Sequence, residues 1–148
     1  MIRLQSTKDN TSNGLTTTLK TASNHFDINP RTKNVTWFAV LNYMEAHRPL
    51  IPPRAYRERM MTDAQVEASY QIDRSWLPLW KYNAGLHDYS DAELEVIRGT
   101  YDASLAELDD LFADLLARLA SGGWLENTVV ILTSDHGEHL GEHHLLDH

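Results

Sequence analysis

The sequence contains no cysteine among its 148 residues. Disulfide bonds, thiolate metal ligands and a cysteine nucleophile are therefore excluded within these residues. Basic residues are also few, because 13 Lys and Arg stand against 21 Asp and Glu, which leaves a formal net charge of -8. A nucleic-acid-binding protein needs a basic face for the phosphate backbone, so we expect no nucleic-acid partner.

Long hydrophobic runs are missing as well. The apolar run at residues 129–132 is among the longest, whereas a transmembrane helix needs about 20 apolar residues. We therefore expect no membrane span. The first residues lead directly into polar sequence without the apolar region of a signal peptide. These absences leave the location unknown and favour the cytoplasm.

Two compact apolar runs stand out in the sequence, at residues 35–41 and 128–133. Each is short and rich in β-favouring residues, which predicts a strand buried on both faces, as in a parallel sheet. Residues 1–34 are instead rich in Thr, Ser, Asn and Lys, with almost no periodic apolar pattern. That composition predicts a disordered or loosely packed segment, so we place the structured domain at residues 35–148.

Between the two predicted strands the sequence favours helices. Short helices fit residues 53–61 and 63–72. A clearer signal begins at Ser90, because Ser90 and Glu93 have the spacing of a capping box. From there apolar residues recur every three or four positions as far as a Gly-Gly pair, which predicts one long helix; they are Leu94, Ile97, Tyr101, Leu105, Leu108, Phe112, Leu115 and Leu119.

This order of strand, helices and strand predicts an α/β fold with the two strands as parallel neighbours or near neighbours. Ligands in such folds gather beyond the carboxyl ends of the strands. The two loops at those ends are residues 42–53 and 134–148. We therefore expect His47 and Asp135 to lie at the same edge of the sheet.

The loop at residues 134–148 holds five of the eight histidines and four acidic residues. A carboxylate and an imidazole directly after a buried strand can bind a divalent cation, and Asp135 and His136 are such a pair. One alternative is a solvated, histidine-rich tail. Another is the H-x-x-E-H pattern of inverted zinc peptidases at residues 139–143, but two nearby glycines disfavour the helix that this pattern requires.

Both loops also resemble signatures of the sulfatase family, in the alkaline-phosphatase-like superfamily. The first resemblance is Thr-Ser-Asp-His-Gly-Glu at residues 133–138, followed by Gly-Glu-His at 141–143 and preceded by Glu-Asn-Thr at 126–128. The second is at residues 42–53, where a strand leads to a histidine and then to prolines. The resemblance covers residues 35–148 and implies part of an α/β/α layered fold with a mostly parallel sheet.

The resemblance also implies roles for individual residues. Asp135 and His136 match metal ligands, and His47 matches the histidine that contacts the sulfate group and helps the leaving oxygen depart. His148 stands where these sulfatases commonly carry lysine, and would be catalytic as well. The implied cofactor is a divalent metal ion, calcium in the first place and manganese or zinc as alternatives, since His136 replaces an asparagine found in many calcium-binding sulfatases. The implied substrate is a sulfate ester of a small molecule or a glycan.

The sequence departs from the family pattern at two points, because the family's first acidic metal pair, normally found after its first strand, is missing as well as its nucleophile. The family's nucleophile comes from a C/S-x-P-x-R motif, or is a threonine in related transferases, and no such motif occurs here. We therefore expect a fragment of a sulfuric ester hydrolase that is inactive by itself. The alternatives are a phosphodiesterase or phosphoethanolamine transferase of the same superfamily, or a non-catalytic metal-binding remnant.

Overall fold

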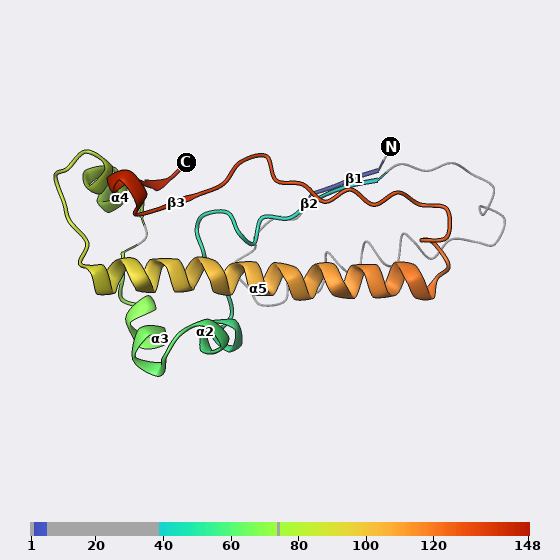
Figure 1. Ribbon diagram of the computed structural model, residues 1–148, viewed down its shortest axis with the longest axis horizontal. Coiled ribbons are helices and arrows are strands. Elements are labelled where there is room, and N and C mark those ends of the chain that lie inside the picture. Colours follow the sequence, from blue (N-terminus) through green and yellow to red (C-terminus); the bar gives the residue numbers. More distant parts are fainter. Residues whose placement is uncertain (1, 6–38, 74) are drawn as a thin grey trace.

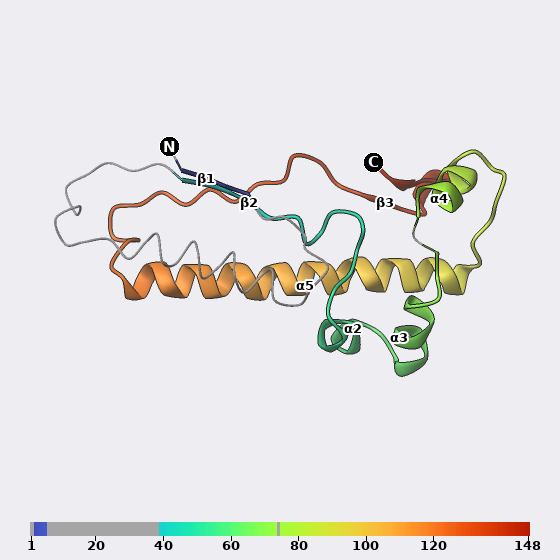
Figure 2. The ribbon, with the colours of Figure 1, turned by 180° about the vertical axis from the view of Figure 1, so that it is seen from behind.

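The computed structural model describes residues 2–5, 39–73 and 75–148. One long helix, α5 (Asp91–Ser121), forms the spine of this part of the molecule (Figure 1). Helices α2 (Arg54–Met60) and α3 (Asp63–Ser69) pack on one side of it. The strands β1 (Ile2–Gln5) and β2 (Ala39–Asn42) and the C-terminal segment run along the other side, as the reverse view also shows (Figure 2).

The predicted long helix is confirmed, and its ends are set by local chemistry. The Ser90 hydroxyl accepts a hydrogen bond from the Glu93 backbone amide at 3.3 Å, and the Glu93 carboxylate accepts one from the Ser90 amide at 2.8 Å. This capping box satisfies amide groups that have no partner inside the helix. At the other end Gly123 has a φ of +73°, a conformation that glycine adopts without strain.

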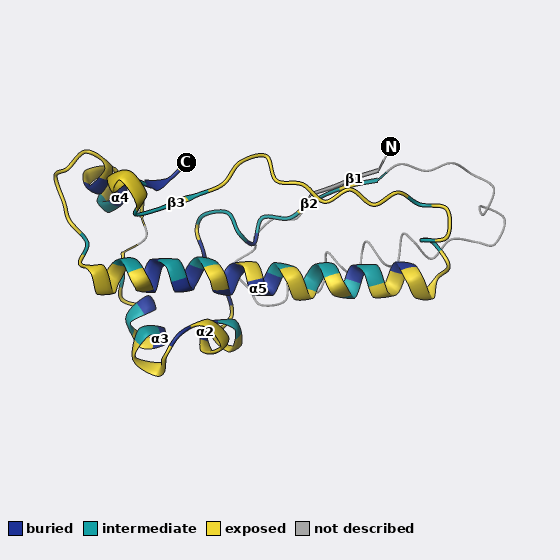
Figure 3. Cartoon of the chain, in the orientation of Figure 1, coloured by how far each residue is buried: buried dark blue, intermediate teal, exposed yellow. Residues whose placement is uncertain are grey.

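The short helices α2 and α3 also form where the sequence predicts them, although α3 ends at Ser69 rather than at residue 72. Val66 of α3 is fully buried in a cluster with Met61 and Val96 of α5. Gly99 permits this close packing, because a Cβ atom there would lie only 2.5 Å from the Met61 Cγ. Most of the buried residues of α5 lie in its first half, where these helices pack against it (Figure 3).

Helix α4 (Trp76–Asn83) was not predicted. The apolar periodicity that would indicate a helix is obscured by Pro78 and by several apolar side chains that are exposed. Pro78 is tolerated because it lies in the first turn, where backbone amides have no partner within the helix. Leu79 and Tyr82 of this helix are buried in a second cluster, together with Ile97 and Leu146.

The strands differ most from the prediction. Strand β2 begins at Ala39, within the predicted strand, whose residues 35–38 lie outside the described residues. It pairs in parallel with β1, which lies in the segment predicted to be loosely packed. The predicted strand at residues 128–133 is wrong: these residues are extended but belong to no strand, and Val129 is 86% exposed.

The two runs were expected to be parallel neighbours or near neighbours in one sheet, but the described part of the first run pairs with β1, and residues 128–133 form no strand. A strand buried on both faces needs hydrogen-bonding neighbours and covering layers. Among the described residues, none pairs with residues 128–133. The layered α/β/α fold that the resemblance implies is therefore present only in part: the described residues contribute helices and the parallel pair β1–β2 rather than a complete layered sheet.

Within the described ranges, no helix has both the length and the apolar content needed to cross a membrane.

Candidate functional site

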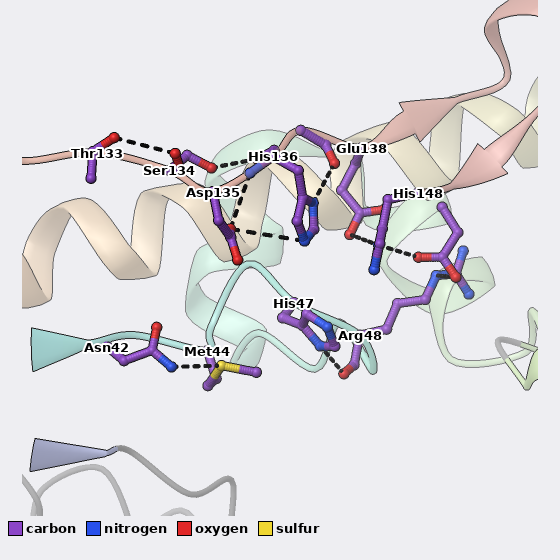
Figure 4. Close-up of polar contacts among 12 residues, drawn as sticks. Asn42, Met44, His47, Arg48, Thr133, Ser134, Asp135, His136, Glu138 and His148 are labelled. Atoms are coloured by element: carbon purple, nitrogen blue, oxygen red, sulfur yellow. Dashed lines mark hydrogen bonds and ion pairs between the residues drawn. The ribbon is translucent and has the colours of Figure 1, made fainter.

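Three histidines from distant parts of the sequence lie close together. The His47 ring, in the loop after β2, lies 5.7 Å from the His148 ring, measured between ring centroids. The His136 ring stacks on the other side of this group, with its centroid 4.1 Å from that of His148 and the planes at 26°. Figure 4 shows the three rings with Asp135 and Glu138 around them. Their sequence-based roles remain predictions, but the structure does bring the two loops together.

Side chains of helices α4 and α5 hold the C-terminal loop that carries His136 and His148. Strands β3 (His139–Leu140) and β4 (Leu146–Asp147) form an antiparallel pair. Asn83 of α4 holds β4 through two hydrogen bonds, from its side-chain amide to the Leu146 carbonyl at 2.9 Å and from the Leu146 amide to its side-chain oxygen at 2.8 Å. Arg98 of α5 donates to the Leu140 carbonyl at 3.0 Å. The loop is thus fixed at both strands.

The H-x-x-E-H pattern at residues 139–143 does not form the α-helix that an inverted zinc peptidase requires. His139 lies in β3, whereas His143 lies in the short 3₁₀ helix η2 (Glu142–His144) with a φ of +57°. The two histidines therefore do not lie one turn apart on an α-helix, and the inverted zinc peptidase alternative is excluded.

His136 is oriented in a way that suits metal binding. Its Nδ1 lies 2.8 Å from the Gly137 carbonyl oxygen, which only accepts hydrogen bonds, so Nδ1 carries a proton. This bond leaves Nε2 for a ligand, an arrangement common among metal-binding histidines. The Nε2 atom lies 3.8 Å from an Asp135 carboxylate oxygen. The pKa of His136 is raised, first by the bond to the Gly137 carbonyl and also by nearby carboxylates, including Asp135.

His47 has a similar arrangement. Its Nδ1 lies 2.7 Å from the Arg48 carbonyl oxygen, which only accepts hydrogen bonds, so Nδ1 donates to it. The loop that carries it is irregular, as its prolines predict.

Two carboxylates that the sequence did not single out surround His148. The Asp147 Oδ1 lies 2.9 Å from the His148 Nδ1, and a Glu138 oxygen lies 3.8 Å from the same atom. Both carboxylates are shielded from solvent, with side-chain exposures of 4% for Asp147 and 6% for Glu138. Burial raises the pKa of Glu138, and the nearby charge of Asp147 adds to this effect. Arg48 lies on the far side of Asp147, 3.6 Å from its Oδ2.

Glu138, Asp147 and His148 form a second donor group that could hold a metal ion, with one ligand atom from each within 4.8 Å of the others. Glu138 is part of the motif at residues 133–138, so a signal for it was present in the sequence. Asp147 and Arg48 carry no such signal beyond their positions next to His148 and His47.

Comparisons with known proteins agree with the motifs in these loops. The sequence model of the family described as Sulfatase matches residues 5–148. This match begins well before residue 35, where the resemblance between the motifs starts. No solved structure matches the chain.

Several curated proteins are similar over shorter stretches. The multifunctional alkaline phosphatase superfamily protein PehA of Trinickia caryophylli is 43% identical over 56 residues, which make up 38% of this chain and 11% of that protein. Arylsulfatase K of Danio rerio is 40% identical over 55 residues, 37% of this chain and 10% of its own length. Arylsulfatase K of Xenopus laevis is 35% identical over 81 residues, 45% of this chain and 15% of its own length. The matched stretches thus span only a small part of these relatives.

Proposed function

Since the chain belongs to the sulfatase family, we propose that its histidine cluster forms part of a site for sulfate-ester hydrolysis. The observation that carries this proposal is the convergence of His47, His136 and His148 from two separate loops. A sulfate ester is an anion that only accepts hydrogen bonds. It therefore requires donors that are fixed in place before it binds.

His47 and His148 are the proposed sulfate-contacting residues. The two rings lie 5.7 Å apart, measured between their centroids, and the His47 Nδ1 is oriented by the Arg48 carbonyl oxygen at 2.7 Å. In its imidazolium form each ring can donate from Nε2 to a sulfate oxygen or to the leaving oxygen of the alcohol. His148 would thus take the place of the lysine usual in the family, and its charge would depend on pH.

Asp135 and His136 are the proposed metal ligands. The donor set fits a divalent cation, because the carboxylate is exposed and the His136 Nε2 is free of the bond that holds Nδ1. A metal bound there would supply Lewis-acid stabilisation of the sulfate charge. The imidazole donor favours manganese or zinc over calcium, whereas the family resemblance favours calcium. Two protein ligands are few for any of these ions, so we expect weak binding.

Phosphoester chemistry is the alternative. The name of PehA refers to the whole alkaline phosphatase superfamily rather than to sulfatases. A phosphoryl group has the same requirement for a metal and for histidine donors, so the cluster alone suits both. Sulfate-ester and phosphoester hydrolysis can be separated by assaying an intact active site with an aryl sulfate and an aryl phosphate side by side.

The metal proposal can be tested on the chain itself. Calorimetric titration with calcium, manganese and zinc should show weak binding that disappears in Asp135→Ala. The matched control is His143→Ala/His144→Ala, which removes two nearby exposed histidines and should leave binding unchanged. Survival of binding in Asp135→Ala, with loss in the double variant, would assign the metal to a histidine-rich surface instead. Loss in Glu138→Gln alone would assign it to the second donor group and overturn this choice of ligands.

A further inference from the structure

We propose that Glu138, Asp147 and His148 bind one divalent transition-metal ion, zinc or manganese. One ligand atom from each residue lies within 4.8 Å of the other two. The Asp147 Oδ1 is 2.9 Å from the His148 Nδ1, and the Glu138 Oε1 is 3.8 Å from the same nitrogen (Figure 4). Donor atoms that lie about 2.1 Å from one ion are about 3–4 Å from one another. The three atoms are therefore spaced as ligands of a single ion.

The Asp147 Oδ1 atom points to a cation rather than to an ordinary ion pair. The Asp147 side chain is only 4% exposed, and no described residue forms a hydrogen bond with its Oδ1. The His148 Nδ1 is close enough for a hydrogen bond but is not aligned for one. Two donor atoms that share an ion are this close without a bond between them. A buried carboxylate oxygen without a hydrogen bond is unfavourable, and a bound cation would supply the interaction.

The charges around this oxygen also favour a cation. The Glu138 side chain is 6% exposed, so two carboxylates that are shielded from solvent lie beside each other. Like charges at this separation destabilise each other unless a positive charge lies between them. Arg48 pairs with Asp147, but its Nε lies 3.6 Å from Oδ2, which is the other oxygen. The guanidinium therefore compensates one side of the Asp147 carboxylate, and the ion would compensate the side shared with Glu138 and His148.

The helices hold these ligands in place before any ion binds. Asp147 directly follows Leu146, whose backbone is bound by Asn83 of α4. Glu138 directly precedes β3, whose Leu140 carbonyl is bound by a side chain of α5. Fixed ligands lose little freedom when an ion binds. The site should therefore bind more tightly than the pair proposed at residues 135 and 136, which offers two ligands, one of them a carboxylate that is 90% exposed.

The donor types select the class of ion. Two carboxylates and one imidazole form a mixed set of oxygen and nitrogen donors. Calcium and magnesium prefer oxygen alone, whereas imidazole suits zinc and carboxylates suit manganese. Ligation through Nδ1 also leaves the His148 Nε2, which faces a different direction, for the proposed sulfate contact. This compatibility rests on the proposed function, whereas the cation site does not.

The test is calorimetric titration of the full chain with zinc and, separately, with manganese, at about pH 7.5, where histidine is mostly neutral. We expect one binding event that is tighter than the weak binding expected at Asp135 and His136. Glu138→Gln and Asp147→Asn should each weaken the tighter event at least about tenfold, because each removes a charged ligand. Asparagine suits position 147, where φ is +79°. Thermal unfolding followed by circular dichroism checks that both variants are folded.

Two matched controls change other carboxylates. Asp135→Asn should remove the weak event and leave the tighter one. Asp88→Asn changes a carboxylate that also lies beside a histidine, His144, but is 87% exposed, and it should leave both events unchanged. A second measurement identifies the ligand atom: in nuclear magnetic resonance of the chain with ¹⁵N-labelled histidine, zinc should shift Nδ1 of His148, whose signals are identified by their loss in His148→Gln.

The proposal is overturned if the unmodified chain shows no event tighter than the one lost in Asp135→Asn, or if the tighter event survives in both Glu138→Gln and Asp147→Asn. A zinc shift at other histidines only, with His148 unchanged, would overturn it as well. Failure of the proposed function looks different. If the tighter event were confirmed and an intact active site hydrolysed no aryl sulfate, the proposed function would fall and the cation site would stand.

Discussion

Helix α5 and the segment at residues 124–138 both carry apolar side chains, but only the helix buries many of them. Leu115 and Leu119 of α5 are buried, whereas Val129 and Ile131 in the segment are 86% and 81% exposed. A helix completes its hydrogen bonds within itself and needs cover on one face only. A strand depends on neighbours for its hydrogen bonds and, in a parallel sheet, on layers over both faces.

Strand pairing begins again at residue 139, where side chains of the helices bind the backbone. The β3–β4 pair receives hydrogen bonds from Asn83 and Arg98, which both lie on helices. The hydrogen bonds described at residues 133–137 instead join near neighbours within that segment. The histidine cluster therefore depends on the helical part of the molecule, and weakening that part should disturb the site. Four predictions test this comparison.

The largest effect is expected at Arg57 in the helical part. Its side chain is fully buried, donates to the Pro52 carbonyl at 3.0 Å and to the Ser69 hydroxyl at 2.6 Å, and lies over the Tyr70 ring. Arg57→Ala would leave a cavity and unpaired acceptors, so the free energy of unfolding should fall by about 3 kcal/mol or more. Urea unfolding followed by circular dichroism measures the loss.

The control for this prediction is Arg54→Ala, on the same helix. Arg54 is half exposed, and its ion pairs with Glu58 and Glu67 lie on the surface. Such pairs contribute at most about 1 kcal/mol. If both variants lost the same free energy of unfolding, burial of the Arg57 side chain would not be the source of its contribution.

The second prediction compares one chemical change in both regions. Val66 is fully buried, and Val129 is 86% exposed. Val66→Ala should cost about 2 kcal/mol of unfolding free energy through lost packing, whereas Val129→Ala should change it by less than about 0.5 kcal/mol. The measurement is again urea unfolding. A cost at Val129 as large as that at Val66 would mean that residues 128–133 are covered in solution.

The third prediction addresses the link between helix and site. Asn83→Ala removes both hydrogen bonds to the Leu146 backbone and leaves a part-buried amide and carbonyl unsatisfied. We expect a local loss of about 1–2 kcal/mol, which corresponds to roughly 5- to 30-fold faster hydrogen exchange at the Leu146 amide. Asn127→Ala, at an exposed position in the turn after α5, is the control. Unchanged exchange in Asn83→Ala would show that the strand pair holds without α4.

The smallest effect concerns pH and Glu138. Its pKa is raised in the folded chain, chiefly by burial, so folding favours the protonated form. The folded state therefore binds the proton more tightly than the unfolded state, and stability falls as pH rises from the ordinary pKa of about 4.3 through the raised value. Glu138→Gln removes this titration. The variant should have a higher melting temperature than the unmodified chain at pH 7 and almost none of that advantage at pH 4.

If the advantage of Glu138→Gln were the same at both pH values, its cause would be packing rather than charge. Asp73→Asn serves as the opposite control. Hydrogen bonds from Ser75 lower the pKa of Asp73, so the ionised form is favoured by folding. That variant should lose stability relative to the unmodified chain at pH 7 and much less at pH 3.

The sequence alone determined the features that depend on residues close to one another in the chain. The capping box at Ser90 and Glu93 predicted the start of α5, and the Gly-Gly pair predicted its end. The motif at residues 133–138 and the histidine before the prolines predicted the family. Each depends on hydrogen bonds or residue types within a few positions, so no tertiary contact is needed to recognise it.

Only the tertiary structure decided where the buried positions and the carboxylates lie. The apolar run at residues 128–133 reads as a core strand, yet it is exposed because burial depends on neighbours rather than on composition. Helix α4 is explained only by tertiary packing, because its Leu79 and Tyr82 side chains pack against Ile97 and Leu146. Asp147 has no motif of its own, and its ion pair with Arg48 at 3.6 Å joins two loops that are far apart in the sequence.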